Sequence, residues 1–302
     1  PPRSTLFPYT TLFRSFLIAE LKKLFQSGDI SIVNLENPIS NRGEKYNLDK
    51  VIFFRGSPLY TGILTEMGIN LVSLANNHIF DYGMDALVDT LAILNRLGIS
   101  QAGYGKNLAD ALNGPVFELS GKKVRFMAYN SIYPYNVRAR GDMPGISMIN
   151  PATLSEEIRE ARRGVDLVYV SCHAGLEYLS LPEPEKIALY RQMIDAGADA
   201  VLGHHPHVIQ PIEIYRGKPI IYSMGNLIFD QYRNELTRDE MVVELNYFNG
   251  RLTHIFKHFF RMNEEFQPIA LKNREVEALL ARIDFRSAQG NRLAGKPERG
   301  AE

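Results

Sequence analysis

Short apolar runs alternate with longer amphipathic segments through most of this 302-residue chain. The apolar runs have the length and composition of buried strands, and they lie at residues 30–33, 69–74, 124–129, 165–171, 200–202 and 219–223. Segments with helical spacing separate them, such as 84–97 and 183–196. Strands that alternate with helices of about ten residues or more predict an α/β fold with a largely parallel sheet.

The pattern changes in the C-terminal part of the chain. Residues 241–248 and 251–260 alternate between apolar and polar side chains, as half-buried strands do. Asn249-Gly250 between them is a strong hairpin signal, because both residue types accept the left-handed backbone of a tight turn. We expect a further strand near 268–271 and a helix over 274–285 after the hairpin.

We expect one domain over residues 16–285, in which 233–285 form a C-terminal hairpin and helix extension. Residues 1–15 repeat Thr-Leu-Phe and Arg-Ser and follow neither the helical nor the strand period, so we interpret them as a non-native leader. The tail at 286–302 is polar and contains Gly and Pro, which predicts disorder.

Charge and composition exclude several classes of function. The formal net charge is zero, which gives no support for a nucleic-acid partner or for binding to an anionic membrane surface. No apolar run approaches the roughly 20 residues of a membrane span, and no signal-peptide pattern is present. The single cysteine, Cys172, excludes an internal disulfide, and its apolar surroundings favour a buried packing role.

The most unusual local feature is Gly203-His204-His205-Pro206-His207, which holds three of the seven histidines. It follows the apolar run Ala200-Val201-Leu202 directly, so it is expected at the end of a buried strand. An extended backbone would aim His205 and His207 the same way, and neutral imidazole is the commonest protein ligand for metals. A polar loop is the plainer alternative for one histidine, whereas three at one strand end favour a metal site.

Other polar side chains also follow expected strands. The set contains a carboxylate, an amide and several imidazoles, namely Glu36, Asn77, His78, His173, His205 and His207. Ligands of open α/β sheets bind at the carboxyl edge of the strands. Taken singly, Glu36 could be a solvated loop acid, Asn77 a turn residue and His173 a satisfied core histidine. Together they supply ligands suited to Zn, Mn or Fe, and a shared carboxylate would hold two ions.

Five stretches lie in an informative order along the chain. They are Asn34-Leu35-Glu36, Ser73-Leu74-Ala75-Asn76-Asn77-His78 with Asp81-Tyr82-Gly83, His173-Ala174-Gly175-Leu176-Glu177, Gly203-His204-His205-Pro206-His207-Val208 and Tyr222-Ser223-Met224-Gly225-Asn226. In these stretches the chain resembles the CapA family, named for poly-γ-glutamate capsule synthesis. The resemblance covers residues 16–230 and, more loosely, the chain to about residue 271. It implies a calcineurin-like metallophosphoesterase fold, which is a layered α/β/β/α sandwich.

The resemblance also implies a role for each matching ligand residue. Glu36 takes the place of the carboxylate that bridges two metals. Asn77, His173 and His205 would complete the second metal site, and His207 would bind the first metal.

The remaining matches are implied to act beside the ligands. His78 would be the non-ligand histidine that stabilises the phosphoryl oxygen or protonates the leaving group. The residues implied to lie at the rim of the site and to orient its ligands are Asp81, Glu177, His204 and Asn226.

The chain departs from the family pattern at its beginning. The family opens with a strand that ends in Gly-Asp, whose Asp binds the first metal, whereas Gly28-Asp29 here precedes the strand that leads to Glu36. We therefore expect that the first strand is missing and that one ligand of the first metal is absent. On this hypothesis the chain would hold one divalent ion (Mn, Zn or Fe), where a complete family member holds two.

Two functions of different classes follow. The first is a CapA-like protein of capsule biosynthesis with a metal-dependent, phosphoesterase-like hydrolase site that uses a bridging hydroxide. The alternative is a non-catalytic component of a capsule-polymer synthesis or export complex, with a structural or degenerate metal site. A third and plainer interpretation is an α/β protein whose histidines are incidental.

The resemblance finally implies the surroundings in which the protein acts. The substrate would be an anionic polymer or a phosphoester. The partners would include membrane subunits of capsule synthesis, and no nucleic acid is expected. Family members are commonly tethered at the outer face of the membrane. The expectation of a cell-envelope location rests on the resemblance alone, because we find no membrane or signal segment in these residues.

Overall fold

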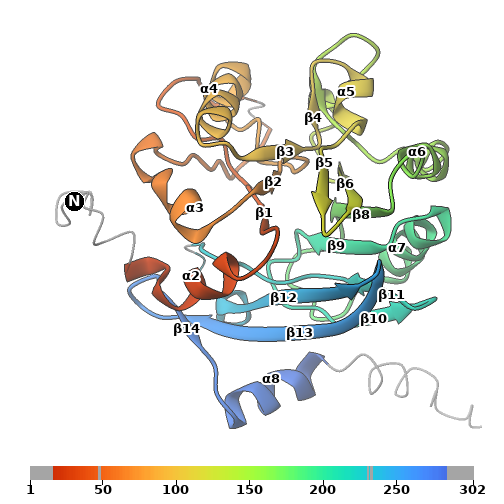
Figure 1. Ribbon diagram of the computed structural model, residues 1–302. Helices are drawn as coiled ribbons and strands as arrows, with labels where there is room; N and C mark the ends of the chain where they lie inside the picture. Colours follow the sequence, from red (N-terminus) through yellow and green to blue (C-terminus); the bar gives the residue numbers. More distant parts are fainter. Residues whose placement is uncertain (1–15, 47–48, 230, 232–233, 284–302) are drawn as a thin grey trace, which may run out of the picture.

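Figure 1 shows the computed structural model, which describes residues 16–46, 49–229, 231 and 234–283. The leader expected at 1–15 and the tail expected at 286–302 lie outside the described residues. Within them, helices alternate with parallel strands, and an antiparallel hairpin follows. The α/β class predicted from the sequence is confirmed.

Three parallel strands form the N-terminal sheet. Its order is β1–β2–β3, with β1 at Ile32–Asn34, β2 at Leu71–Ser73 and β3 at Ser100–Ala102. Helix α3 (Gly62–Met67) leads into β2, and α4 (Gly83–Arg96) leads into β3. Among the described strands, β1 pairs with β2 alone, and the expectation of a missing first strand stays a prediction.

A six-stranded sheet has the order β10–β11–β9–β8–β6–β5. Its four inner strands are parallel, and β5 and β10 pair antiparallel at the two edges. The strands are β5 (Val116–Leu119), β6 (Lys122–Asn130), β8 (Leu167–His173), β9 (Ala200–His204), β10 (Ile212–Tyr215) and β11 (Lys218–Ile221). Strands β5 and β6 follow each other directly and pair as an antiparallel hairpin.

Two helices cover one face of this sheet (Figure 1). They are α6 (Leu154–Ala161) and α7 (Pro184–Ala196). Ile158 of α6 and Tyr190 of α7 are buried in one cluster with Val170 of β8. The β8 strand is buried along its whole length, as expected for a central parallel strand that has both faces covered.

The C-terminal sheet packs on the other face. It contains β12 (Asp239–Phe248), β13 (Arg251–Met262) and β14 (Pro268–Ala270) in that order. Tyr247 of β12 packs against Tyr169 of β8, with ring centroids 5.7 Å apart. Figure 1 shows helix α8 beneath this hairpin, which completes the expected layered α/β/β/α order.

The predicted hairpin turn between β12 and β13 is confirmed. Asn249 and Gly250 have φ angles of 50° and 74°, the left-handed backbone that this turn needs.

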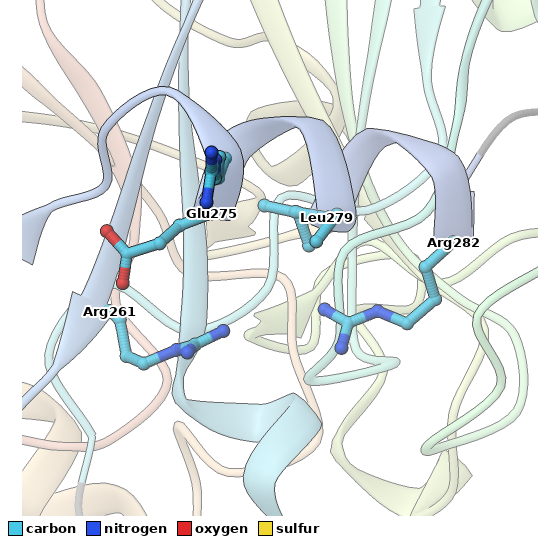
Figure 2. A pocket seen from close by; sticks show the side chains of 6 residues that line it. Arg261, Glu275, Leu279 and Arg282 are labelled. Carbon is cyan, nitrogen blue, oxygen red and sulfur yellow. The ribbon is translucent and has the colours of Figure 1, made fainter.

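Helix α8 (Arg274–Ile283) is fastened to the hairpin by an apolar contact and an ionic contact. Figure 2 shows Leu279 and Arg282 of α8 together with Arg261 of β13. Leu279 is buried in a cluster with side chains of β12 and β13. Beside it, the Asp239 carboxylate is 1% exposed; its Oδ1 accepts a bond of 2.7 Å from Arg261, and its Oδ2 accepts a bond from Arg282. We call Asp239, Arg261, Arg282 and α8 the C-terminal seam.

Short elements differ most from the sequence expectation. The 3-10 turn η2 (Pro58–Tyr60) comes directly before α3, and helix α2 (Ala19–Gln26) comes before β1. The elements that were not predicted are α5 (Leu108–Leu112), β7 (Gly145–Ile146, paired with β4, Tyr104–Gly105), β10, η3 (Tyr135–Val137) and η4 (Glu235–Arg238). So few residues carry too little periodicity to be recognised. Among the described helices, none combines the length and apolar composition that a membrane crossing requires.

Candidate metal centre

Polar side chains from both parallel sheets meet at the carboxyl ends of four strands. Those that follow or end β1, β2, β8 and β9 are Glu36, Asn77, His78, His173, His205 and His207. The fold therefore brings together the residues singled out in the sequence, at the edge where open α/β sheets bind ligands.

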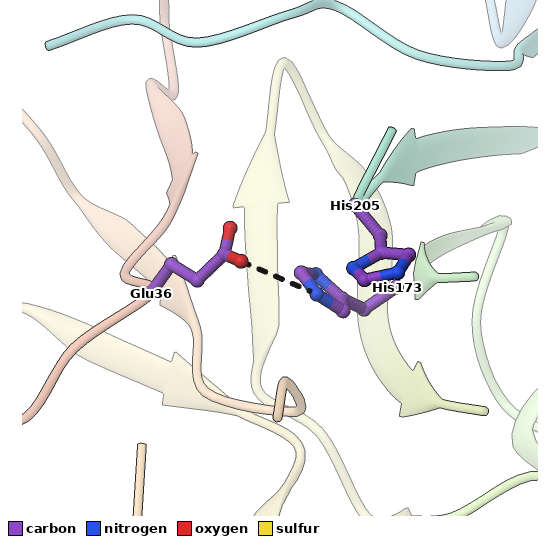
Figure 3. Close-up of side chains that lie close together, drawn as sticks. All are labelled: Glu36, His173 and His205. Atoms are coloured by element: carbon purple, nitrogen blue, oxygen red, sulfur yellow. Dashed lines mark ion pairs between the residues drawn. The ribbon is translucent and has the colours of Figure 1, made fainter. Parts of the chain in front are cut away.

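Glu36 lies opposite the histidines (Figure 3). Its Oε1 is 3.5 Å from His173 Nε2 and 3.8 Å from His207 Nε2, and its Oε2 accepts a bond of 2.9 Å from Asn34. Burial, followed by the negative charge of Glu177, raises the pKa of Glu36 to about 8. The carboxyl group is thus held where a positive charge would stabilise its ionised form.

His173 and His205 form the other wall of this group. Their ring centroids are 4.9 Å apart, and His173 Nε2 is 2.8 Å from Asn77 Oδ1. Burial lowers the pKa of His205 to about 3 and the pKa of His173 well below its usual value. Both imidazoles are therefore neutral at pH 7, which is the form that binds metals.

The backbone at the histidine cluster corrects one sequence expectation. The prediction of an extended backbone through His205 and His207 is wrong, because their φ angles are 97° and 59°. Strand β9 ends at His204, and the two rings still lie 6.0 Å apart. Left-handed backbone is uncommon for residues other than glycine and concentrates at functional sites.

Behind His207, the Asn226 side chain fixes the ring. His207 Nδ1 is 2.8 Å from Asn226 Oδ1, so Nδ1–H donates to the amide oxygen and leaves Nε2 as the free ligand atom. Asn226 Nδ2 in turn donates to Thr237 O at 3.0 Å. Asn226, which was expected at the rim of the site, thus orients the ring of His207, the expected ligand of the first metal.

Two overlapping groups could hold an ion. Glu36, His173 and His205 offer ligand atoms that lie within 4.8 Å of one another, and so do Glu177, His205 and His207. The Glu177 side chain is exposed, in contrast to the buried histidines of its group. Both groups need the His205 ring.

His78 lies beside these groups and is paired with Asp81. Its Nδ1 is 2.7 Å from Asp81 Oδ2, and Asp81 is 1% exposed. Burial lowers the pKa of His78, and the hydrogen bond with Asp81 acts in the opposite direction. A neutral His78 donates through Nδ1 and keeps Nε2 free for proton exchange.

His204 belongs to neither group. It is the last residue of β9, and burial together with the charge of Lys186 lowers its pKa to about 3.

Sequence reasoning missed four residues at this site. Lys50 contacts Asp81 and the carbonyl oxygen of Asn77. The Phe54 ring packs against His78 in a tilted arrangement, with 4.1 Å between ring centroids. Tyr178 and Phe229 stack beside His207 at 6.2 and 5.5 Å. The sequence offered no signal for Lys50 or the two phenylalanines, because they come from irregular loops, whereas Tyr178 follows Glu177 directly.

The residues present fit a divalent cation. Glu36 Oε1 is buried, has no hydrogen-bond partner among the described residues and lies 3.5 Å from His173 Nε2. The buried Nδ1 of His205 has no hydrogen-bond partner among them either. Such unsatisfied atoms cost about 1–3 kcal/mol each, so an unsatisfied carboxylate oxygen beside neutral imidazoles favours a bound ion. The nitrogen and oxygen donors suit Zn, Mn or Fe.

The fold and this donor set define an α/β protein with a metal-type site at the carboxyl ends of its parallel strands. Residues 9–231 match the family described as bacterial capsule synthesis protein PGA_cap. The chain belongs to this family, which confirms the resemblance to CapA proteins.

Curated relatives agree with the family assignment. The chain is 32% identical to the PGA biosynthesis protein CapA of Bacillus subtilis over 225 residues, which are 74% of this chain and 59% of that protein. It is 31% identical over 235 residues to the capsule biosynthesis protein CapA of Bacillus anthracis, covering 76% of this chain and 57% of that protein. A probable polyglutamine synthesis accessory protein of Mycobacterium tuberculosis is 34% identical over 213 residues, which are 67% and 56% of the two chains. The chain thus spans less than two thirds of each of these relatives.

Two solved structures are similar at low sequence identity. Haemophilus influenzae NAD nucleotidase has a TM-score of 0.47 and 17% identity, covering 89% of this chain and 55% of that chain. A 5'-nucleotidase precursor from Thermus thermophilus has a TM-score of 0.45 and 18% identity, covering 76% and 45%.

Proposed function

We propose that the chain carries a metal-dependent hydrolase site of the phosphoester-cleaving type and serves in capsule-polymer biosynthesis. One observation carries the proposal: a buried carboxylate oxygen without a hydrogen-bond partner, Glu36 Oε1, faces the neutral imidazoles His173 and His205, and His78 is held by Asp81 beside them. Structural metal sites are usually closed by their ligands. A histidine poised for proton transfer next to the ligands favours chemistry.

Each residue has a distinct part in this proposal. Glu36, His173 and His205 would hold a divalent cation, with the Asn77 amide oxygen beside them. Such a cation, when bound, supplies Lewis acidity toward a phosphoryl oxygen. His78 exchanges a proton with a substrate oxygen through Nε2, because its Nδ1–H is committed to Asp81.

The polymer context rests on the family. The relatives' names concern capsule or polyglutamate synthesis, so we propose an anionic polymer or a phosphoester linked to its assembly as the substrate. We further propose membrane capsule-synthesis subunits as partners and the cell envelope as the location.

A non-catalytic role with one structural ion is the second candidate. The observation that favours it is the shared ring: both ligand groups contain His205, so the two groups compete for one imidazole. A site with one ion would still bind polymer carboxylates without cleaving a bond.

Counting metal is the first experiment. Folded chains are loaded with manganese or zinc, and bound metal is measured beside a His205→Ala/His207→Ala double variant and an exposed control, His254→Ala. We expect at least one ion per chain, lost in the double variant and kept in the control. A folded chain that binds no metal would refute the hydrolase site.

Turnover separates the two candidates. Bis(p-nitrophenyl) phosphate and p-nitrophenyl phosphate serve as probes, with His78→Gln as the diagnostic variant. A hydrolase loses turnover in this variant and keeps its metal. Metal binding without turnover in the unaltered protein would favour the non-catalytic role.

A further inference from the structure

Lys50 lies in an irregular loop, and its ammonium group reaches the metal centre. Its Nζ donates to Asn77 O at 2.7 Å and to Asp81 Oδ1, and it lies 3.2 Å from His78 Nδ1. The Lys50 side chain is 11% exposed, so the ammonium group is largely withdrawn from water. Such withdrawal is costly for a lysine unless its donors are matched.

The contacts divide Asp81 between several donors. Oδ1 receives Lys50, and Oδ2 receives the His78 ring at 2.7 Å and the Phe54 backbone N–H at 2.7 Å. His78 Nδ1 donates to Asp81, so it cannot also accept a hydrogen bond from Lys50. The two groups lie close together because both donate to the same carboxylate. Asp81 is thus fixed from both sides.

We propose that Lys50 is a positioning residue of the metal centre, which ties the main chain of Asn77 to the carboxylate of Asp81. This inference rests on the proposed function. Asn77 and His78 are consecutive, but their side chains have different roles. The Asn77 amide oxygen contacts His173, and His78 is the proposed proton-transfer group. One ammonium group that holds the Asn77 carbonyl and the partner of His78 fixes both side chains relative to each other.

The expected effect of removing Lys50 can be estimated from other groups that orient metal ligands. Groups that orient metal ligands without touching the ion cost about 10–100-fold in metal affinity or activity when they are removed. Without Lys50, the Asn77 carbonyl and Asp81 Oδ1 would lose their donor in a region where Asp81 is 1% exposed. The ring of His78 would then lose the fixed position of its partner.

A plainer role must be separated from this one. Lys50 could simply fasten its loop to the protein, as Arg55 does by stacking on the Tyr82 ring at 4.1 Å. Lys45, in the same loop, is exposed and lies over the Phe53 ring at 4.9 Å. These two residues supply matched controls, because neither has a recorded contact with Asn77, His78 or Asp81.

The test compares Lys50→Met with Lys50→Arg, Lys45→Met and Arg55→Ala. Manganese affinity is measured by titration calorimetry, kcat and KM with bis(p-nitrophenyl) phosphate, and folding by thermal melting. We expect Lys50→Met to weaken manganese binding about tenfold and to lower kcat by about 10–100-fold while KM changes little. Lys50→Arg should recover most of both losses, and Lys45→Met should behave as the unaltered protein.

The outcomes are separable. If Arg55→Ala reproduces the losses of Lys50→Met, loop attachment explains them and the positioning role is refuted. If the unaltered protein binds manganese and Lys50→Met binds it equally tightly with the same kcat, this inference fails and the metal site stands. If the unaltered protein binds no metal, the proposed function fails and takes the inference with it.

Discussion

The metal centre and the C-terminal seam both contain buried ionisable side chains, but only those in the seam have their hydrogen-bonding atoms paired. At the metal centre, Glu36 Oε1 and His205 Nδ1 are buried and have no hydrogen-bond partner among the described residues. In the seam, Asp239 is 1% exposed, but Arg261 and Arg282 each donate to one of its two oxygens. The backbone differs too, since His205 has a left-handed φ of 97° and Asp239 begins a regular strand.

The difference separates a site built for a ligand from one built for stability. An unsatisfied buried polar atom costs free energy, and proteins retain it where a ligand or a reaction uses it. A matched carboxylate needs no ligand. The two regions meet at Asn226, which accepts from His207 and donates to Thr237 O, two residues before Asp239.

Replacing Glu36 should produce the largest effect. Glu36→Gln removes the carboxylate of the first ligand group, so manganese affinity should fall at least about 100-fold, beyond the cost of losing an outer partner. The free energy of unfolding without metal should not fall, because the lost carboxyl oxygen has no hydrogen-bond partner among the described residues and the nearby imidazoles are neutral. Calorimetric titration and urea unfolding measure the two quantities. Glu244→Gln, on the half-exposed hairpin, is the control. Unchanged metal affinity in Glu36→Gln would show that Glu36 is not a ligand and that the two regions do not differ in this way.

Asp239→Asn should show the reverse pattern. Two arginines would lose a charged partner, and hydrogen bonds to charged groups are worth about 1.5–3 kcal/mol, so the unfolding free energy should fall by that order. Metal affinity should stay unchanged. Asp195→Asn, which breaks an exposed pair with Arg216, should cost less than about 1 kcal/mol. Loss of metal without loss of stability in Asp239→Asn would show that the seam serves the site.

Asn226→Ala sharpens the boundary between the two regions. It frees the His207 ring, so manganese affinity should drop about tenfold, which corresponds to about 1.4 kcal/mol. Asn234→Ala is the matched control, because Asn234 accepts a bond from Leu236 N and has no recorded contact with His207. Equal metal affinities in both variants would remove Asn226 from the site.

Glu240 tests whether an unsatisfied buried carboxyl group also costs stability outside the metal centre. It follows Asp239 in the chain, but its own carboxyl oxygens have no hydrogen-bond partner among the described residues. It is fully buried, and burial raises its pKa well above the usual value. A folded-state pKa above the unfolded value gives stability that is complete at low pH and is lost as pH rises. Glu240→Met should therefore stabilise the protein by about 1 kcal/mol or more, with a larger gain at pH 8 than at pH 5.

Urea unfolding at the two pH values measures this gain. Glu240→Gln is the control that removes the ionisation and keeps the polarity, so it should flatten the pH dependence with a smaller gain. A Glu240→Met variant that is less stable at pH 8 would assign Glu240 a partner or a function of its own.

The long elements and the residue types that gather at the strand ends were predictable from sequence. Helix α4, strand β8 and the β12–β13 hairpin repeat their period over enough residues to be recognised, and Asn249-Gly250 marks the hairpin turn. The site residues were recognisable because each follows an apolar run. Elements such as α5 and β7 were missed, since five residues or fewer carry almost no periodic signal.

Sequence by itself determined which residue types stand at the strand ends, because strand period and residue chemistry are local properties. Only the tertiary structure decided which atoms meet. Lys50 is 27 residues from Asn77 and 31 from Asp81, and Asp239 is 22 and 43 residues from its arginines, so no local pattern links them. The left-handed backbone at His205 and His207 is likewise set by packing around the cluster, because residues other than glycine seldom adopt that conformation unless their surroundings impose it.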